Sequence, residues 1–304
     1  MVRSGVVESV HRASLVVLGP DGAIVLALGD VDVPVFPRSS NKPLQAVAML
    51  EAGWRPADER QLALATASHS GEPQHLQVVR STLAGAGLSE PALQCPAMLP
   101  LSTPAAHALL AGGQVASALT MNCSGKHAAM LATCVQNGWR TESYLAPEHP
   151  LQQAVLRTVE RLAGEPVRHV AVDGCGAPQH ALSLTGLACA FAALATRDGE
   201  VGRTARAMRA HPELVGGTGR DVSDLLAGVP GLVCKDGAEG VYAAGLPDGS
   251  AVAVKVADGA TRAAPLVLVA GLRELGVAGE VLDRLATVPV LGGDAQVGVL
   301  RGTR

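Results

Sequence analysis

Aromatic residues are scarce in this chain of 304 residues, at 2%, and no apolar run approaches the roughly 18 residues that a membrane-spanning helix needs. The interior must therefore be built from Ala, Val and Leu, whose small side chains let helices and strands pack closely. A net charge of −3 offers no basic surface for nucleic acid. Because Glu8 and Arg12 interrupt any signal-peptide core, we expect a cytoplasmic protein that binds neither nucleic acid nor membrane.

Lysine is also scarce. The 24 basic residues comprise 20 arginines and only four lysines, namely Lys42, Lys126, Lys235 and Lys255. Arginine stays protonated at any working pH, whereas burial or a neighbouring cation can neutralise a lysine amine. The few lysines are therefore candidates for chemistry that requires an amine able to lose its proton.

The six cysteines do not form the framework of disulfides that a small secreted domain needs, so most are expected to be buried thiols. Cys123 and Cys175 differ from the others because Gly, Asn, Lys and Asp surround them.

The segment at 38–43 (Arg-Ser-Ser-Asn-Lys-Pro) comes directly before an apolar, helix-forming run at 44–50. Ser39 and Lys42 are three residues apart, and one helical turn would bring the hydroxyl and the amine to the same face. A neutral lysine in that position can accept the proton of a serine nucleophile. The alternative is a helix capped by serine, with a solvated lysine.

The order of the expected elements indicates the fold class. Apolar segments at 13–18 and 23–28 flank Gly-Pro-Asp-Gly, which predicts a β-hairpin. We expect further strands at 167–172, 231–235, 240–244 and 251–256, and helices at 44–50, 58–66, 74–84, 105–111, 128–136, 151–162, 181–196, 202–211, 221–226 and 265–275.

The pattern predicts an α/β (α+β) protein in which both chain ends contribute to one antiparallel sheet. That sheet lobe covers about 1–37 and 229–304, and a helical lobe covers about 38–228. No linker or repeat separates them, so we expect a single domain over 1–304 with a shared core.

Polar clusters at 38–43, 68–72, 122–127 and 173–178 each follow a regular element, where site residues are commonly displayed. His69 follows Ser68 directly, and adjacent side chains rarely face each other, so we expect His69 to be structural or to face a ligand.

The cluster at 122–127 begins a predicted helix. Cys123, Lys126 and His127 share one side of that helix, and with the distant Cys175 they could bind a metal. The alternative is an anion site formed by free N–H groups at the helix start.

Five motifs occur here in the order found in the rhizobial-type (class 3, asparaginase II) L-asparaginases, and the chain resembles that family from about His11 to Val256. The motifs are Arg-Ser-x-x-Lys-Pro at 38–43, Ala-Ser-His-Ser-Gly-Glu at 67–72, Asn-Cys-Ser-Gly-Lys-His at 122–127, Asp-Gly-Cys at 173–175 and Lys-x-Gly-Ala at 235–238. The resemblance implies a fold similar to serine β-lactamases and glutaminases. It also implies hydrolysis of L-asparagine to L-aspartate and ammonia by a homodimer.

Carried over by motif, the resemblance implies two Ser–Lys pairs. Ser39 would pair with Lys42, and Ser68 with Lys235. Ser39 would attack the side-chain amide carbon, and Arg38 would hold the substrate α-carboxylate.

The resemblance further implies a Zn²⁺ ion near the substrate, held by Cys123, Lys126 and Cys175. A lysine ligand requires a neutral amine, and His127 is the replacement third ligand if the lysine does not serve. Asn122 and His127 would contribute to substrate binding. Two other interpretations of the motifs are a penicillin-recognising acyl-serine hydrolase and a non-catalytic protein that binds zinc or an amino acid.

Overall fold

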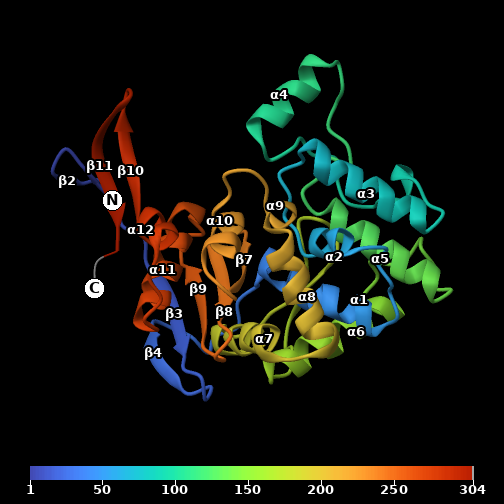
Figure 1. The fold of residues 1–304 in the computed structure, drawn as a ribbon, viewed down its shortest axis with the longest axis horizontal. Helices are drawn as coiled ribbons and strands as arrows, with labels where there is room; N and C mark the ends of the chain where they lie inside the picture. Colours follow the sequence, from blue (N-terminus) through green and yellow to red (C-terminus); the bar gives the residue numbers. More distant parts are fainter. Residues whose placement is uncertain (303–304) are drawn as a thin grey trace.

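A five-stranded antiparallel sheet, built from both ends of the chain, is the framework of the molecule (Figure 1). The structure is a computed structural model and describes residues 1–302. The strand order β4-β3-β9-β8-β7 places the N-terminal hairpin beside three late strands. The strands are β3 (Ala13–Leu18), β4 (Ile24–Leu28), β7 (Val233–Gly237), β8 (Val241–Gly245) and β9 (Ala251–Val256). The predicted hairpin and the contribution of both chain ends are confirmed.

Helices cover both faces of this sheet. A Cβ on Gly245 of β8 would lie 2.1 Å from the carbonyl oxygen of Phe191 in α7 (Leu184–Thr196). A Cβ on Gly271 of α11 (Ala264–Glu274) would lie 2.6 Å from Val252 of β9. Val252 pairs with Ala244, the neighbour of Gly245, and successive strand residues point to opposite faces. The two helices therefore lie on opposite faces, at distances that only small residues permit.

The helix α1 (Lys42–Glu51) lies at the centre of the helical lobe (Figure 1) and packs against α5, α6 and α8. Leu44, Met49 and Leu50 point in different directions around the helix, yet all are fully buried. A helix that is apolar on all sides belongs in a core, so the start of α1 has a fixed position.

The other helices of this lobe lie close to the predicted ranges. They are α2 (Glu59–Ala65), α3 (Pro73–Gly85), α4 (Thr103–Ala111), α5 (Ser124–Gln136), α6 (Pro150–Ala163), α8 (Gly199–Ala210) and α10 (Asp221–Gly228). The structure adds α9 (Pro212–Val215), α12 (Glu280–Leu285) and three 3₁₀ helices, η1 (Arg38–Asn41), η2 (Glu90–Ala92) and η3 (Thr261–Ala263). The predicted strand at 167–172 is reduced to β5 (Val170–Val172), which pairs with β6 (Pro178–His180).

The outermost segments of the chain form a second sheet, which differs from the single sheet expected. Its order is β10-β11-β1-β2, with β10 (Thr287–Gly292), β11 (Ala295–Arg301), β1 (Val2–Arg3) and β2 (Val6–Val7). In Figure 1 this sheet stands beside α12, away from the helical lobe. The strands β1 and β2 are too short to show any periodic pattern. No strand was predicted for the segment after residue 275, which contains β10 and β11.

One continuous set of buried apolar side chains connects the sheets and the helical lobe. The predicted shared core is therefore present. None of the helices within residues 1–302 has the length and apolar character needed to cross a membrane.

Candidate active site

The segment that begins α1 presents three of the predicted site residues. Arg38 has a left-handed backbone conformation, with φ of 54°, which is strained for a residue with a side chain. Its Nε donates to Asp173 Oδ1 at 2.7 Å, and this ion pair anchors the segment to the cluster at 173–178. The Lys42 backbone N–H then donates to the carbonyl of Ser39. Strain at such a position is typical of a site held for function.

The Lys42 amine is buried and bonded to the segment that follows α2. Its Nζ donates to the Ala67 carbonyl at 2.5 Å and lies 3.1 Å from Ser68 Oγ. Within residues 1–302 the Ser39 hydroxyl has no hydrogen-bond partner, and Ser39 is partly exposed. Lys42 therefore contacts the serine of the other predicted pair.

Lys235 is fully buried on β7, and its amine binds its own neighbour rather than Ser68. Nζ donates to the Asp236 carboxylate and, at 3.0 Å, to the Asp236 carbonyl. Arg220 Nη2 donates to the other Asp236 oxygen at 2.8 Å. The predicted Ser68–Lys235 hydrogen bond is absent among the described residues, because the carboxylate next to Lys235 offers its amine a stronger acceptor.

Lys42 is close enough to Lys235 for its charge to affect the pKa of Lys235. Burial lowers the pKa of Lys235, and the charges of Lys42 and Arg220 lower it further, against the effect of Asp236. Burial opposes ionisation of Asp236, but Lys235 and Arg220 hold its pKa at about 2. The carboxylate is thus charged, while Lys235 is easier to deprotonate than an exposed lysine.

Glycine at position 237 lets β7 approach the start of α1. A Cβ there would lie 2.5 Å from the Pro37 carbonyl oxygen and 3.3 Å from the backbone nitrogen of Ser40. Any side chain would push the strand away, so Gly237 helps bring Lys235 toward the segment of Ser39 and Lys42. The four predicted catalytic residues therefore lie in one region, although their hydrogen bonds differ from the predicted pairing.

The start of α5 and the turn before β6 bring the predicted metal ligands together. Lys126 Nζ lies 3.1 Å from Cys175 Sγ. A hydrogen bond with Cys123, aided by Lys126 and His127, holds the pKa of Cys175 far below its ordinary value despite burial. The same hydrogen bond and burial raise the pKa of Cys123. Cys175 is accordingly the more acidic thiol of the pair, and Cys123 the less acidic one.

His127 lies beside this pair. Its Nδ1 lies 2.6 Å from the Tyr144 hydroxyl, whereas Nε2 is buried and has no hydrogen-bond partner within residues 1–302. Burial lowers the pKa of His127, so the ring is neutral. A buried nitrogen without a partner is costly in a folded protein unless a ligand or water satisfies it.

The donor set fits a zinc ion only if the lysine takes part. No three His, Cys, Asp or Glu side chains in the described part of the chain are arranged to hold a metal. Burial opposes the charge on Lys126, but the Cys175 and Cys123 sulfurs and Asp173 raise its pKa, so a metal would have to displace a proton from the amine. Two soft sulfur ligands and an amine nitrogen nevertheless suit zinc, which accepts both sulfur and nitrogen donors.

The remaining predicted substrate-binding residues are placed as follows. The Asn122 carbonyl accepts from the His69 backbone N–H, and Asn122 Oδ1 lies 3.5 Å from Cys123 Sγ. Arg38 uses Nε for Asp173, and its terminal nitrogens make no hydrogen bond within residues 1–302. They remain able to bind an anion.

His69 does not pair with Ser68, as expected for adjacent side chains. Its Nδ1 accepts from the Gly71 N–H, so Nε2 carries the proton and donates to Ser124 Oγ at 2.8 Å. The ring stacks on His75, with centroids 5.3 Å apart. His69 therefore ties the Ser68 segment to the start of α5.

Four residues that contact this site were not singled out from the sequence: Asp173, Arg220, Asp236 and Tyr144. Asp173 begins the Asp-Gly-Cys motif at 173–175, and Asp236 follows Lys235 directly. For both, closeness in sequence to a candidate site residue was the available signal. Arg220 and Tyr144 gave none, because tertiary packing alone brings them to the site.

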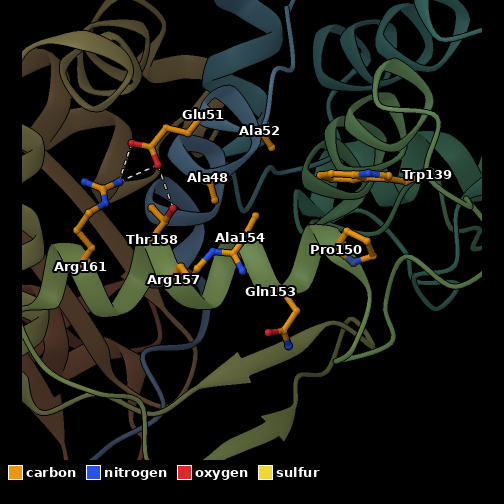
Figure 2. A pocket seen from close by; sticks show the side chains of 10 residues that line it. All are labelled: Ala48, Glu51, Ala52, Trp139, Pro150, Gln153, Ala154, Arg157, Thr158 and Arg161. Atoms are coloured by element: carbon orange, nitrogen blue, oxygen red, sulfur yellow. Dashed lines mark hydrogen bonds and ion pairs between the residues drawn. The ribbon is translucent and has the colours of Figure 1, made fainter.

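A surface depression of about 650 Å³ lies elsewhere, between α1 and α6 (Figure 2). It is lined by Ala48, Glu51, Ala52, Trp139, Pro150, Gln153, Ala154, Arg157, Thr158 and Arg161. Figure 2 shows the Glu51 carboxylate between Arg161 and Thr158. Glu51 ends the helix that Lys42 begins, roughly 13 Å away along its axis at 1.5 Å per residue. None of the predicted site residues lines this depression.

Comparisons with known proteins agree with the motifs. Residues 1–302 match the family model described as L-asparaginase II. The comparison with curated proteins gives no match. The family match spans nearly the whole chain and is the finding that bears on function.

Several solved structures are distantly similar. A β-lactamase from Mycobacterium bovis is 17% identical, with 87% of this chain and 95% of that chain covered and a TM-score of 0.45. Mglu in its glutamate form is 16% identical, with 90% and 61% covered and a TM-score of 0.48. EstCE1, a hydrolase with promiscuous acyltransferase activity, is 14% identical, with 86% and 93% covered and a TM-score of 0.45. Such distant likenesses say nothing about substrate.

Proposed function

The chain belongs to the L-asparaginase II family, and from that premise we propose that it hydrolyses L-asparagine to L-aspartate and ammonia through a serine nucleophile. The observation that carries the serine-type mechanism is the buried Lys42 amine, 3.1 Å from Ser68 Oγ and one turn from Ser39. A buried lysine that contacts one serine and follows another by one helical turn is suited to moving a hydroxyl proton.

Ser39 is the proposed nucleophile. It is partly exposed and its hydroxyl is free of other hydrogen bonds within the described chain, so a substrate can reach it. Ser68 is buried and already bonded to Lys42, which suits proton transfer better than attack. Ser39 Oγ would bond to the side-chain amide carbon while the Lys42 amine takes the hydroxyl proton. Backbone N–H groups at the start of α1 would stabilise the oxyanion.

Proton transfer to the leaving group completes the first half-reaction. The proton taken by Lys42 would pass through Ser68 to the amide nitrogen, with Lys235 supporting the transfer, and the C–N bond would break to release ammonia. A water molecule would then attack the aspartyl ester. Its proton would return to Ser39 as aspartate leaves.

Charged and polar groups around the nucleophile would orient the substrate. The free terminal nitrogens of Arg38 can hold the α-carboxylate in a paired arrangement. Asn122 and His127, at the start of α5, would bind the remaining polar groups of the amino acid. The buried Nε2 of His127, which has no hydrogen-bond partner in the described part of the chain, supports that role.

Cys123, Lys126 and Cys175 would hold a Zn²⁺ ion next to these groups. When bound, the ion would supply positive charge that favours the substrate carboxylate. We propose in addition that the protein is cytoplasmic and acts as a homodimer, as the family resemblance implies.

The test is ammonia release by the purified protein from L-asparagine, L-glutamine and a chromogenic β-lactam in parallel. We expect release from asparagine and its loss in Ser39→Ala. Hydrolysis of the β-lactam alone would favour a penicillin-recognising hydrolase. Asparagine binding without ammonia release would favour a non-catalytic amino-acid binding protein.

A further inference from the structure

Arg220 connects two parts of the site that the proposed mechanism leaves separate. It precedes α10, and its Nη2 donates to Asp236 Oδ2 at 2.8 Å. Its Nη1 reaches the carbonyl oxygen of Ser68 at 3.5 Å. The other Asp236 oxygen accepts from Lys235. One carboxylate is thus shared by two cations, and one of these cations also contacts the Ser68 backbone.

Three basic side chains, those of Lys42, Lys235 and Arg220, lie around the charged Asp236 carboxylate. Asp221 offsets their charge less than Asp236 does, because burial and the charge of Asp236 raise the pKa of Asp221. An arginine keeps its proton, so of these three basic side chains only a lysine can release one.

We propose that Arg220 is a positioning residue that keeps Lys235 able to lose its proton. Arg220 shares the Asp236 carboxylate with Lys235 and holds that carboxylate beside Ser68. The proposal rests on the proposed function, in which Lys235 supports proton transfer. Without Arg220, the whole carboxylate charge would stabilise the Lys235 ammonium. With Arg220 in place, that stabilisation is divided.

Titratable and charged groups from several elements surround Lys235. Its own strand supplies Asp236 and Cys234, α1 supplies Lys42, the start of α10 supplies Arg220 and Asp221, and Tyr242 of β8 lies near Asp221. Asp236 favours the ammonium, and Lys42 and Arg220 oppose it. Arg220 is the member whose charge can be removed without altering either lysine.

The first experiment is the pH dependence of kcat/KM for ammonia release by wild type, Arg220→Gln and Arg220→Lys. A base must be deprotonated to act, so activity rises with pH through its pKa. We expect the rising limb of Arg220→Gln to move upward by about one pH unit, the effect of losing one nearby charge, and that of Arg220→Lys to stay near wild type. Arg203→Gln is the matched control, since Arg203 pairs with Glu59 away from the site.

A uniform loss of activity in Arg220→Gln, with an unmoved limb, would show a merely structural role and overturn the proposal. A shift of the same size in Arg203→Gln would do so as well.

The second experiment needs no substrate, so it separates this inference from the proposed function. With only four lysines, ¹³Cε-lysine NMR gives each amine its own signal, and Lys235→Arg identifies that of Lys235. We expect Arg220→Gln to raise the titration midpoint of Lys235, whether or not asparagine is hydrolysed. An unchanged midpoint would overturn the proposal. If Arg220→Gln does not fold, Asp236→Asn must lower the midpoint, and failure to do so would contradict carboxylate sharing.

Discussion

The Lys42 amine lies 3.1 Å from the Ser68 hydroxyl, although 26 positions separate the two residues. The Ala67 carbonyl accepts from the same amine, so Lys42 is fixed against the segment that follows α2. A buried amine held between a carbonyl and a hydroxyl can give up its proton only toward groups in its own pocket. The contact joins Lys42, which follows Ser39 by three positions, to Ser68.

Replacement of Ser39, Lys42 or Ser68 by alanine should in each case abolish most ammonia release while the protein stays folded. Residues that act as one unit have non-additive effects, so Lys42→Ala/Ser68→Ala should be hardly slower than either single variant. Steady-state kinetics with circular dichroism as the folding control would test this. Two modest losses that multiply in the double variant would show that the residues act independently.

Lys235→Arg should lose activity by about 100-fold or more, because a guanidinium keeps its proton and cannot take part in general acid–base transfer. Lys255→Arg is the matched control. Lys255 also lies on the five-stranded sheet, but it bonds backbone carbonyls of Glu239 and Val256. Near-normal turnover by Lys235→Arg would show that position 235 supplies only positive charge.

Zinc removal should raise the KM for asparagine and leave the far-UV circular dichroism unchanged, because a core of this size does not need a metal to fold. Metal affinity should weaken as the pH is lowered, because protons then compete with the metal for both thiolates and the amine. Mass spectrometry should show zinc lost from Lys126→Ala and Cys175→Ala. Zinc retained in Lys126→Ala but lost from His127→Ala would assign the third ligand to His127.

Acid should destabilise the protein through its buried histidines. Burial lowers the pKa of His69 and of His75, which stacks on it. Below about pH 6.5 the unfolded chain binds protons that the folded protein excludes. Stability is therefore full above that pH and falls as pH decreases, by up to about 1.4 kcal/mol per unit for each histidine.

Thermal unfolding of His69→Gln between pH 7 and pH 5 would test this effect. The variant should lose less stability over that range than wild type, whereas His107→Gln, at an exposed position of α4, should behave as wild type. An equal loss in His69→Gln and wild type would mean that other groups cause the acid sensitivity.

Local signals in the sequence predicted much of the fold. The Gly-Pro-Asp-Gly turn and its apolar flanks defined the hairpin, and Lys42 is the first residue of α1. The second sheet was not predicted: β1 and β2 have two residues each, and the longer β10 and β11 were also missed. Pairing that depends on segments almost 300 positions apart leaves no local pattern.

The sequence indicated which residues belong to the candidate site better than it indicated which of them contact one another. Motifs identified Lys42 and Ser68, but their hydrogen bond depends on how α1 packs against α2. Asp236 was overlooked because neighbouring strand residues point to opposite faces, yet the long Lys235 side chain turns back to it. Such choices between acceptors are decided by burial, which a single sequence does not display.

Identification of the acylated residue tests the central claim most directly. Wild-type protein mixed with asparagine should be quenched in acid within one turnover, digested, and its peptides mapped by mass spectrometry. We predict an aspartyl group on Ser39, formed as ammonia is released and absent from Lys42→Ala. An aspartyl group on Ser68, or ammonia release with no acylated peptide at any quench time, would contradict Ser39 as the nucleophile.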